Sequence, residues 1–203
     1  MKLLHRADLF CWSRFDEGRN IDFHSLVWMR PAGNVVVDPL PLSDHERKRL
    51  EMLGGVRHIV VTNSDHVRAT RELAAQTGAR TYGPHAEREG FPITCDVWLS
   101  DGDEVVPGLV ALALDGSKTP GELALLLEDT TLITGDLVRA HAAARLDLLP
   151  DAKLKDAALA RRSLARLAAL SGIEAVLPGD GWPVFRDGQR ALSELAARVG
   201  ATS

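Results

Sequence analysis

Four short polar segments, each following a predicted strand, carry the side chains best suited to chemistry in this sequence. They are TNSDH at 62–66, GSKTPG at 116–121, TGD at 134–136 and PGDG at 178–181. Glycines in such segments let the backbone approach closely, and loops that follow strands often carry binding or catalytic side chains. We therefore take these four loops as the candidate functional site.

The first loop leaves three alternatives open for the adjacent pair Asp65 and His66. At a junction between a strand and a helix, such a pair could bind a metal, act as an acid with its partner, or cap the helix that follows. Asp136 and Asp180 are each also typical of a turn. Asp38, at the end of an apolar run, could orient a ligand from behind or occupy a β-turn.

Bulk composition excludes several classes of protein. The 203 residues carry a net charge of -4, with 26% charged and 45% hydrophobic residues, which is ordinary for a globular domain. The acidic balance and the scattered Lys and Arg disfavour nucleic acid as a partner. The longest apolar run, 109–114, is far below the roughly 20 residues of a membrane-spanning helix. A small-molecule substrate or ligand is the expected partner.

Cysteine usage and the N-terminal segment point to a cytoplasmic protein. Cys11 and Cys95 lie far apart, in neither a CxxC nor a metal-binding spacing. The first ten residues, MKLLHRADLF, are too short and too charged in their apolar part for a secretory signal.

Apolar periodicity and turn signals predict strands and helices in alternating groups. Strands are predicted at 9–12, 23–29, from Val35, and at 56–62, 79–82, 97–99, 104–106, 109–114, 122–127, 131–134 and 174–177. Helices are predicted after a capping box at Ser43 and Glu46, after Asp65, near 85–88, from Asp151 to Ser171, and at the C-terminal end. This order favours an α+β fold, an αββα four-layer sandwich, in a single domain over 1–203.

Together, in this order and spacing, the four loops resemble the metallo-β-lactamase superfamily. The pattern of that family is THxHxDH after a strand, then GHTPG, TGD and a final PGHG-type loop, and here the loops read VVTNSDH, GSKTPG, TGD and PGDG. The match covers roughly residues 35–185. The resemblance implies a metallo-hydrolase-like αββα fold with a divalent metal centre between the loops.

The resemblance also implies that the first of the two metal sites of the family is missing. In the family, the first two histidines of the first motif and the histidine before TPG hold that ion. Aligned without gaps, these positions become Val61, Asn63 and Lys118, and with a loop two residues shorter Asn63 takes the first position. Valine has no lone pair, a neutral amide is a weak ligand, and an ammonium has no lone pair to donate.

The second metal site of the family is largely retained. Asp65, His66 and Asp136 match the motif, and Asp180 replaces its last histidine. One imidazole and three carboxylates favour Mn²⁺ or Fe²⁺, or Mg²⁺, and still permit Zn²⁺. We expect at most one divalent metal, with a metal-free pocket as the alternative. Among the other histidines, which match no ligand spacing, His141 is the nearest in sequence to the TGD loop.

Lys118 is expected to replace the missing first ion. Without a cation, the carboxylates at 65, 136 and 180 would repel one another, and an ammonium in the vacated space would balance them. Asp65 and Lys118 are therefore the candidate catalytic residues. The alternative is a surface lysine between Ser117 and Thr119.

Two functions follow from the resemblance. The first is a metal-dependent hydrolase of an ester, thioester, lactone or phosphoester, in which Lys118 stabilises developing negative charge. The second is a non-catalytic relative, whose pocket is held together by a network of Lys118 and carboxylates and binds a small ligand or a partner protein.

Overall fold

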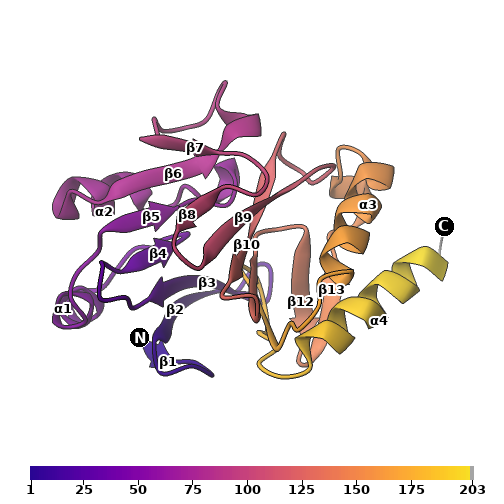
Figure 1. The fold of residues 1–203 in the computed structure, drawn as a ribbon, viewed down its shortest axis with the longest axis horizontal. Coiled ribbons are helices and arrows are strands. Elements are labelled where there is room, and N and C mark those ends of the chain that lie inside the picture. Colours follow the sequence, from indigo (N-terminus) through magenta and orange to yellow (C-terminus); the bar gives the residue numbers. More distant parts are fainter. Residues whose placement is uncertain (202–203) are drawn as a thin grey trace.

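The computed structural model of this chain describes residues 1–201, in which most strands belong to two large sheets (Figure 1). The first sheet has seven strands in sequential order within this range. These are β1 (Lys2–Leu3), β2 (Leu9–Asp16), β3 (Ile21–Trp28), β4 (Val35–Val37), β5 (His58–Val60), β6 (Arg80–Pro84) and β7 (Val97–Leu99). Pairing is antiparallel from β1 to β4 and parallel from β4 to β7.

The second sheet has the order β14-β11-β10-β9-β8. Its strands are β8 (Glu104–Val106), β9 (Leu109–Leu114), β10 (Glu122–Leu127), β11 (Thr131–Thr134) and β14 (Ala175–Pro178). Strands β11 and β14 run parallel, and the other neighbours are antiparallel. A separate antiparallel hairpin consists of β12 (Val138–Ala142) and β13 (Arg145–Leu148).

The helices are short and lie outside the sheets. They are α1 (Asp44–Met52), α2 (Thr70–Thr77), α3 (Ala157–Ala168) and α4 (Gly188–Ala201), with 3-10 turns η1 (Ser64–His66), η2 (His85–Glu87) and η3 (Asp151–Lys153). Within residues 1–201, none of the helices combines the length and apolar character that crossing a membrane requires.

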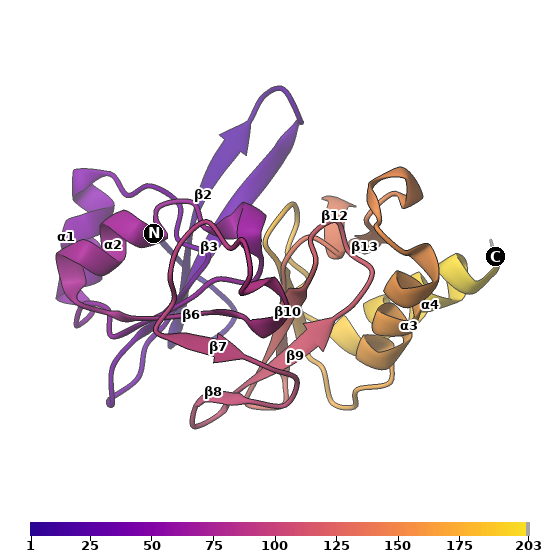
Figure 2. The ribbon, with the colours of Figure 1, turned by 90° about the horizontal axis from the view of Figure 1, so that it is seen from above.

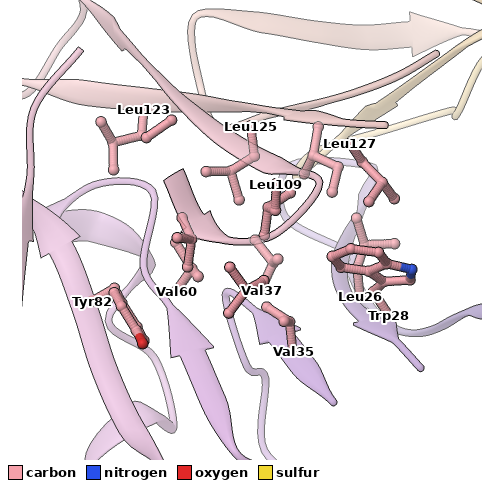
Figure 3. Close-up of a cluster of buried hydrophobic side chains, with 14 of the residues drawn as sticks. Leu26, Trp28, Val35, Val37, Val60, Tyr82, Leu109, Leu123, Leu125 and Leu127 are labelled. Carbon is pink, nitrogen blue, oxygen red and sulfur yellow. The ribbon is translucent and has the colours of Figure 1, made fainter. Parts of the chain in front are cut away.

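The two large sheets pack face to face through a hydrophobic core. Figure 3 shows Val37 and Val60 of the first sheet opposite Leu109 and Leu125 of the second. All four side chains are at most 3% exposed. Burying a large aliphatic side chain stabilises a fold by about 1.5–3 kcal/mol, so this cluster fixes how the two sheets face each other.

Two further hydrophobic clusters attach the helices to the outer faces of the sheets. Leu50 of α1 and Leu73 of α2 pack against the first sheet, and α3 and α4 pack against the second. Figure 2 shows the pairs of helices at opposite ends of the molecule with the strands between them. This arrangement confirms the predicted α+β fold and its αββα layers.

Most predicted elements are present, with a few differences. The capping box of Ser43 and Glu46 starts α1, and Gly78 ends α2 in the left-handed conformation, with φ of 67°. The strand expected at 56–62 is shorter, and the β12-β13 hairpin was not predicted. Its segment VRAHA has no regular alternation of apolar and polar residues, because the buried position 139 is an arginine.

Candidate metal centre

The ends of strands from both large sheets meet at the candidate site. Thr134 and Pro178 pair at the ends of the parallel strands β11 and β14, so the loops that follow these strands leave the sheet side by side. The backbone N–H of Leu123 in β10 donates to the Thr62 carbonyl at 2.8 Å, which joins this sheet to the loop after β5. The four loops singled out in the sequence are thereby drawn to one region.

Three of the predicted ligands converge in this region. Among the described residues, His66, Asp136 and Asp180 each offer a ligand atom, and these atoms lie within 4.8 Å of one another. His66 Nε2 lies 3.6 Å from Asp136 Oδ2 and 3.9 Å from Asp180 Oδ1. Two donors about 2.1 Å from a tetrahedral ion are roughly 3.4 Å apart, so this spacing suits a shared ion.

The η1 turn that carries His66 is capped by Asn63. The Asn63 side-chain oxygen accepts hydrogen bonds from the backbone N–H groups of Asp65 and His66, at 3.0 and 3.2 Å. Its Nδ2 donates to Asp136 Oδ2 at 3.0 Å. Asn63 therefore caps this turn, and helix α2 begins after Ala69 without a side-chain cap, so the interpretation of Asp65 as the helix cap is wrong. Asn63 also ties the first loop to the TGD loop.

Asp38 orients the His66 ring through a contact with Nδ1, the ring nitrogen that points away from Asp136 and Asp180. Its Oδ2 lies 2.8 Å from His66 Nδ1, and its carboxylate accepts from the backbone N–H and the hydroxyl of Thr62 at 2.8 and 2.7 Å. The contact at Nδ1 turns Nε2 toward Asp136 and Asp180. A carboxylate behind a histidine in this way is typical of metal-binding sites, where it fixes the orientation of the ring.

Neighbouring charges determine the ionisation of His66 and Asp136. Burial alone would lower the pKa of His66, but the carboxylates of Asp38 and Asp136 hold this pKa above its usual value. Burial opposes ionisation of Asp136, but His66 and Lys118 hold the pKa of Asp136 below its usual value. Asp136 is therefore ionised at neutral pH although its side chain is only 1% exposed.

Two glycines permit the close approach of the loops. A Cβ atom on Gly179 would lie 2.9 Å from His66 Cε1, a distance that side chains essentially never adopt. A Cβ on Gly135 would lie 3.0 Å from both Glu122 Oε1 and Thr62 Oγ1. The glycines of PGDG and TGD are thus required for packing against the first loop.

Lys118 lies between two carboxylates of the site. Its Nζ is 2.9 Å from Asp65 Oδ2 and 2.9 Å from Asp136 Oδ2. Burial would lower the pKa of Lys118, but both carboxylates together raise it, so the ammonium stays charged. The Lys118 side chain is 26% exposed, unlike the free surface lysine considered as the alternative. Asp65 is directed at Lys118 and lies outside the group formed by His66, Asp136 and Asp180.

Two arginines that the sequence analysis missed contact Asp180. Arg139 Nη2 donates to Asp180 Oδ2 at 3.1 Å, and Arg68 Nη2 lies 3.5 Å from Asp180 Oδ1. Within the described residues, this buried Oδ1 accepts no hydrogen bond. Burial raises the pKa of Asp180, partly offset by His66 and the arginines. Each arginine follows a predicted ligand by two or three residues, but this spacing alone did not distinguish it from a solvated surface arginine.

Glu122 is a further buried acid beneath the site. Its Oε1 accepts from the backbone N–H of Leu137 at 2.9 Å, and its Oε2 accepts from the Ser117 hydroxyl at 2.6 Å. Burial and the charge of Asp136 raise the pKa of Glu122 to about 7. The sequence signal for it was a charged residue opening the apolar strand β10 directly after Pro-Gly.

The donor set fits one divalent ion. His66 Nε2 and the carboxylates of Asp136 and Asp180 supply one nitrogen and two carboxylate oxygen donors, which suit Zn²⁺, Mn²⁺ or Fe²⁺. Asp180 Oδ1, which accepts no hydrogen bond among the described residues, and the contact of Asp38 with His66 Nδ1 both favour an ion at this point. His141, the histidine nearest in sequence to the TGD loop, is exposed on β12 and lies outside the group formed by His66, Asp136 and Asp180.

Comparison with known proteins identifies the family. A family model described as the metallo-beta-lactamase superfamily matches residues 1–199, so this chain belongs to that superfamily. No curated protein matches the sequence at a significant level.

Solved structures of metallo-beta-lactamases are similar over nearly the whole chain. The DIM-1 enzyme is 18% identical with a TM-score of 0.76, covering 98% of this chain and 95% of that one. An enzyme from Pontibacter korlensis is 19% identical with a TM-score of 0.75, covering 98% and 97%. FIM-1 from Pseudomonas aeruginosa, in a mono-zinc form, is 16% identical with a TM-score of 0.71, covering 94% and 90%. At these identities, the likeness concerns the fold.

Proposed function

We propose that this chain is a metal-dependent hydrolase whose centre holds at most one divalent ion. His66, Asp136 and Asp180 would hold the ion, and Lys118 occupies the place of a second one. The observation that carries the proposal is the orientation of His66, whose Nδ1 contacts Asp38 while Nε2 faces the carboxylates of Asp136 and Asp180. The mono-zinc form of FIM-1 supports the compatibility of this fold with a single ion.

The chemistry divides between the ion and the side chains. A divalent ion bound there would act as a Lewis acid on an oxygen of the substrate. Lys118 supplies a fixed positive charge, which stabilises negative charge as it develops on the carbonyl or phosphoryl oxygen under attack. Asp65 positions Lys118 through the 2.9 Å contact with its Nζ. Esters, thioesters, lactones and phosphoesters all develop such a charge, and they form the proposed substrate class.

Asp65 has a second proposed role, as a fourth donor to the ion. Its side chain is 55% exposed, so its carboxylate is free to exchange Lys118 for a metal. Metal analysis of the Asp65→Ala variant separates the two roles. Loss of the bound metal supports a donor, and retained metal with reduced turnover supports a residue that only positions Lys118.

A second candidate function is a metal-free binding module. Its support is the set of cations around the acids, since Arg68 and Arg139 contact Asp180 as Lys118 contacts Asp65 and Asp136. With His66 protonated, these cations balance the aspartates of the site without a metal. A pocket held in this way would bind a small ligand or a partner protein without turnover.

A substrate panel with and without metal tests the hydrolase. Protein without a histidine tag is assayed on a nitrophenyl ester, a thioester, a lactone and a phosphodiester, after chelation and after addition of Zn²⁺, Mn²⁺ or Fe²⁺. We expect at least one activity to fall about a hundredfold or more on chelation, to return with metal, and to be absent in His66→Ala. The matched control is Asp187→Ala, which removes an exposed ion pair with Arg190.

The opposite result would favour the binding module. The hydrolase would be contradicted if the protein hydrolysed none of the panel with any of the three metals and its melting temperature did not change on addition of chelator. Activity that survives chelation does not count as support, because it would come from a different site.

A further inference from the structure

A cavity lies on the opposite face of β3 from the candidate metal centre. Phe23 of β3 pairs with Asp180, and because side chains alternate along a strand, the neighbouring His24 points to the other face. The cavity on that face has a volume of about 410 Å³. Its lining is mainly apolar and includes Leu26, Leu177, Trp182 and Phe185.

The polar lining of this cavity includes a hydrogen-bonded serine and histidine. Ser13 and His24 are direct partners across the antiparallel strands β2 and β3. The Ser13 hydroxyl oxygen lies 2.8 Å from His24 Nδ1, and His24 Nε2 lies 2.6 Å from the Gly181 carbonyl oxygen. A serine, a histidine and a third group that orients the histidine form the arrangement that activates nucleophilic serines.

The contact with Gly181 determines which atom donates. A carbonyl oxygen can only accept, so His24 Nε2 carries the proton and donates it to Gly181. In the neutral ring Nδ1 is then an acceptor, and the Ser13 hydroxyl donates to it. Burial lowers the pKa of His24, and this effect outweighs the Gly181 carbonyl and Asp22, which both raise the pKa. The His24 ring is therefore neutral at pH 7.

We propose that Ser13 is a nucleophile, with His24 as its general base, in a pocket that takes esters with a short apolar acyl chain. The apolar walls at Leu26, Leu177 and Trp182 would hold the acyl chain beside the Ser13 hydroxyl. Lys2, which is exposed and lines the same cavity, supplies positive charge for the oxygen of the ester carbonyl.

The reaction balances with water as the only other reactant. The Ser13 oxygen forms a bond to the acyl carbon while its proton passes to His24 Nδ1. The bond from the acyl carbon to the alcohol oxygen breaks, and the departing alcohol takes the proton from Nδ1. Water then attacks the acyl carbon while His24 Nδ1 again accepts a proton. The bond from the acyl carbon to the Ser13 oxygen breaks, the Ser13 oxygen takes the proton from Nδ1, and the carboxylic acid is released.

This site and the candidate metal centre share one loop but no reacting group. In the segment Pro178–Gly181, the Asp180 side chain contacts Arg139, and the Gly181 carbonyl accepts from His24. The proposal therefore does not depend on the metal-dependent function, and a chelator should leave the reactivity of Ser13 unchanged.

Labelling with an alkyl fluorophosphonate in excess chelator tests the proposal on the full chain. The Ser13 oxygen would displace fluoride from phosphorus, so intact mass should rise by one phosphonyl group and peptide mapping should place it on Ser13. We expect no label in Ser13→Ala and a rate about a hundredfold or more lower in His24→Gln. Ser193→Ala, which removes an exposed serine of α4, should label like the unmodified protein.

Several outcomes would overturn the proposal. These are an unlabelled protein, a label mapped to any residue other than Ser13, and an unchanged labelling rate in His24→Gln. Should Ser13→Ala fail to fold by circular dichroism, the position of the label in the unmodified chain decides, because a hydroxyl that serves only as a cross-strand contact would not react.

Discussion

The two sides of Asp136 differ in how its charge is compensated. On one side, Lys118 Nζ contacts Asp136 and Asp65 directly, at 2.9 Å each. On the other side, His66 Nε2 stands 3.6 Å from Asp136 and 3.9 Å from Asp180, beyond hydrogen-bond distance. On the Lys118 side, an ammonium contacts the carboxylates directly. On the His66 side, the imidazole and the carboxylates are spaced as ligands around an ion are.

Under the proposed function, this difference would allow a binuclear centre to lose one of its two ions while the remaining acids stay paired. On the Lys118 side, the ammonium already contacts both Asp65 and Asp136, so these two carboxylates have a counter-charge without a metal ion. The His66 side has carboxylates already partly matched by Arg68 and Arg139, but Asp180 Oδ1 accepts no hydrogen bond within the described part of the chain. We therefore propose that an ion binds on the His66 side, at His66, Asp136 and Asp180.

Asp136 belongs to both sides, so its neutralisation should have the largest effect. In Asp136→Asn the buried contacts of Lys118 and Asn63 lose their shared anion, and we expect the free energy of unfolding to fall by about 4 kcal/mol. Urea denaturation in chelator measures this change. Asp187→Asn, on an exposed ion pair, should cost less than about 1 kcal/mol. Equal stability of the two variants would show that Asp136 does not join the two sides.

The next largest effect is expected for Glu122, the buried acid next to Asp136, and it is a change in how the free energy of unfolding depends on pH. Its pKa is about 7 in the folded chain, against 4.5 ordinarily. The folded state therefore binds this proton more tightly than the unfolded state, and the contribution of Glu122 to stability is lost as pH rises from about 4.5 to 7. In Glu122→Gln the stability relative to the unmodified chain should rise by about 3 kcal/mol across this range.

Urea denaturation at the two ends of the pH range, in chelator, measures the Glu122 effect. Comparison of the variant with the unmodified chain cancels the titration of the other acids. A difference in stability that stays constant with pH would show that Glu122 is ionised normally and that its burial is offset by other contacts.

Lys118→Met removes the cation from one side only and should have a smaller effect. The substitution keeps the apolar stem but leaves Asp65 and Asp136 without their shared ammonium, so we expect the free energy of unfolding to fall by about 2 kcal/mol. The effect is smaller than for Asp136 because Lys118 is partly exposed. Arg190→Met, at an exposed pair, is the control. An unchanged melting temperature and metal content would contradict the role of Lys118.

The layers and the four loops were predictable because each depends on local sequence. Strand and helix periodicity, the capping box at Ser43 and the order of the polar loops are all visible within short windows. Asp38 was recognised as a residue that could orient a ligand because it directly follows a buried strand. A position for Lys118 among the carboxylates was predicted from the positive charge that these acids would need without a first metal ion.

The arginine contacts were not predictable because they depend on a segment whose position the sequence does not reveal. Arg139 reaches Asp180 because β12 lies beside the last loop, where Ala140 pairs with Gly181. The β12 strand has no alternating pattern that would mark it. Charged residues near polar loops are usually solvated, so Arg68 gave no separate signal.

The metal content of tag-free protein tests the central claim most directly. After incubation with Zn²⁺, Mn²⁺ or Fe²⁺ and dialysis, elemental analysis should find about one equivalent per chain in the unmodified protein and none in His66→Ala. Two equivalents would contradict the replacement of one ion by Lys118. Unmodified protein that retains none of the three metals would contradict an ion site at His66, Asp136 and Asp180.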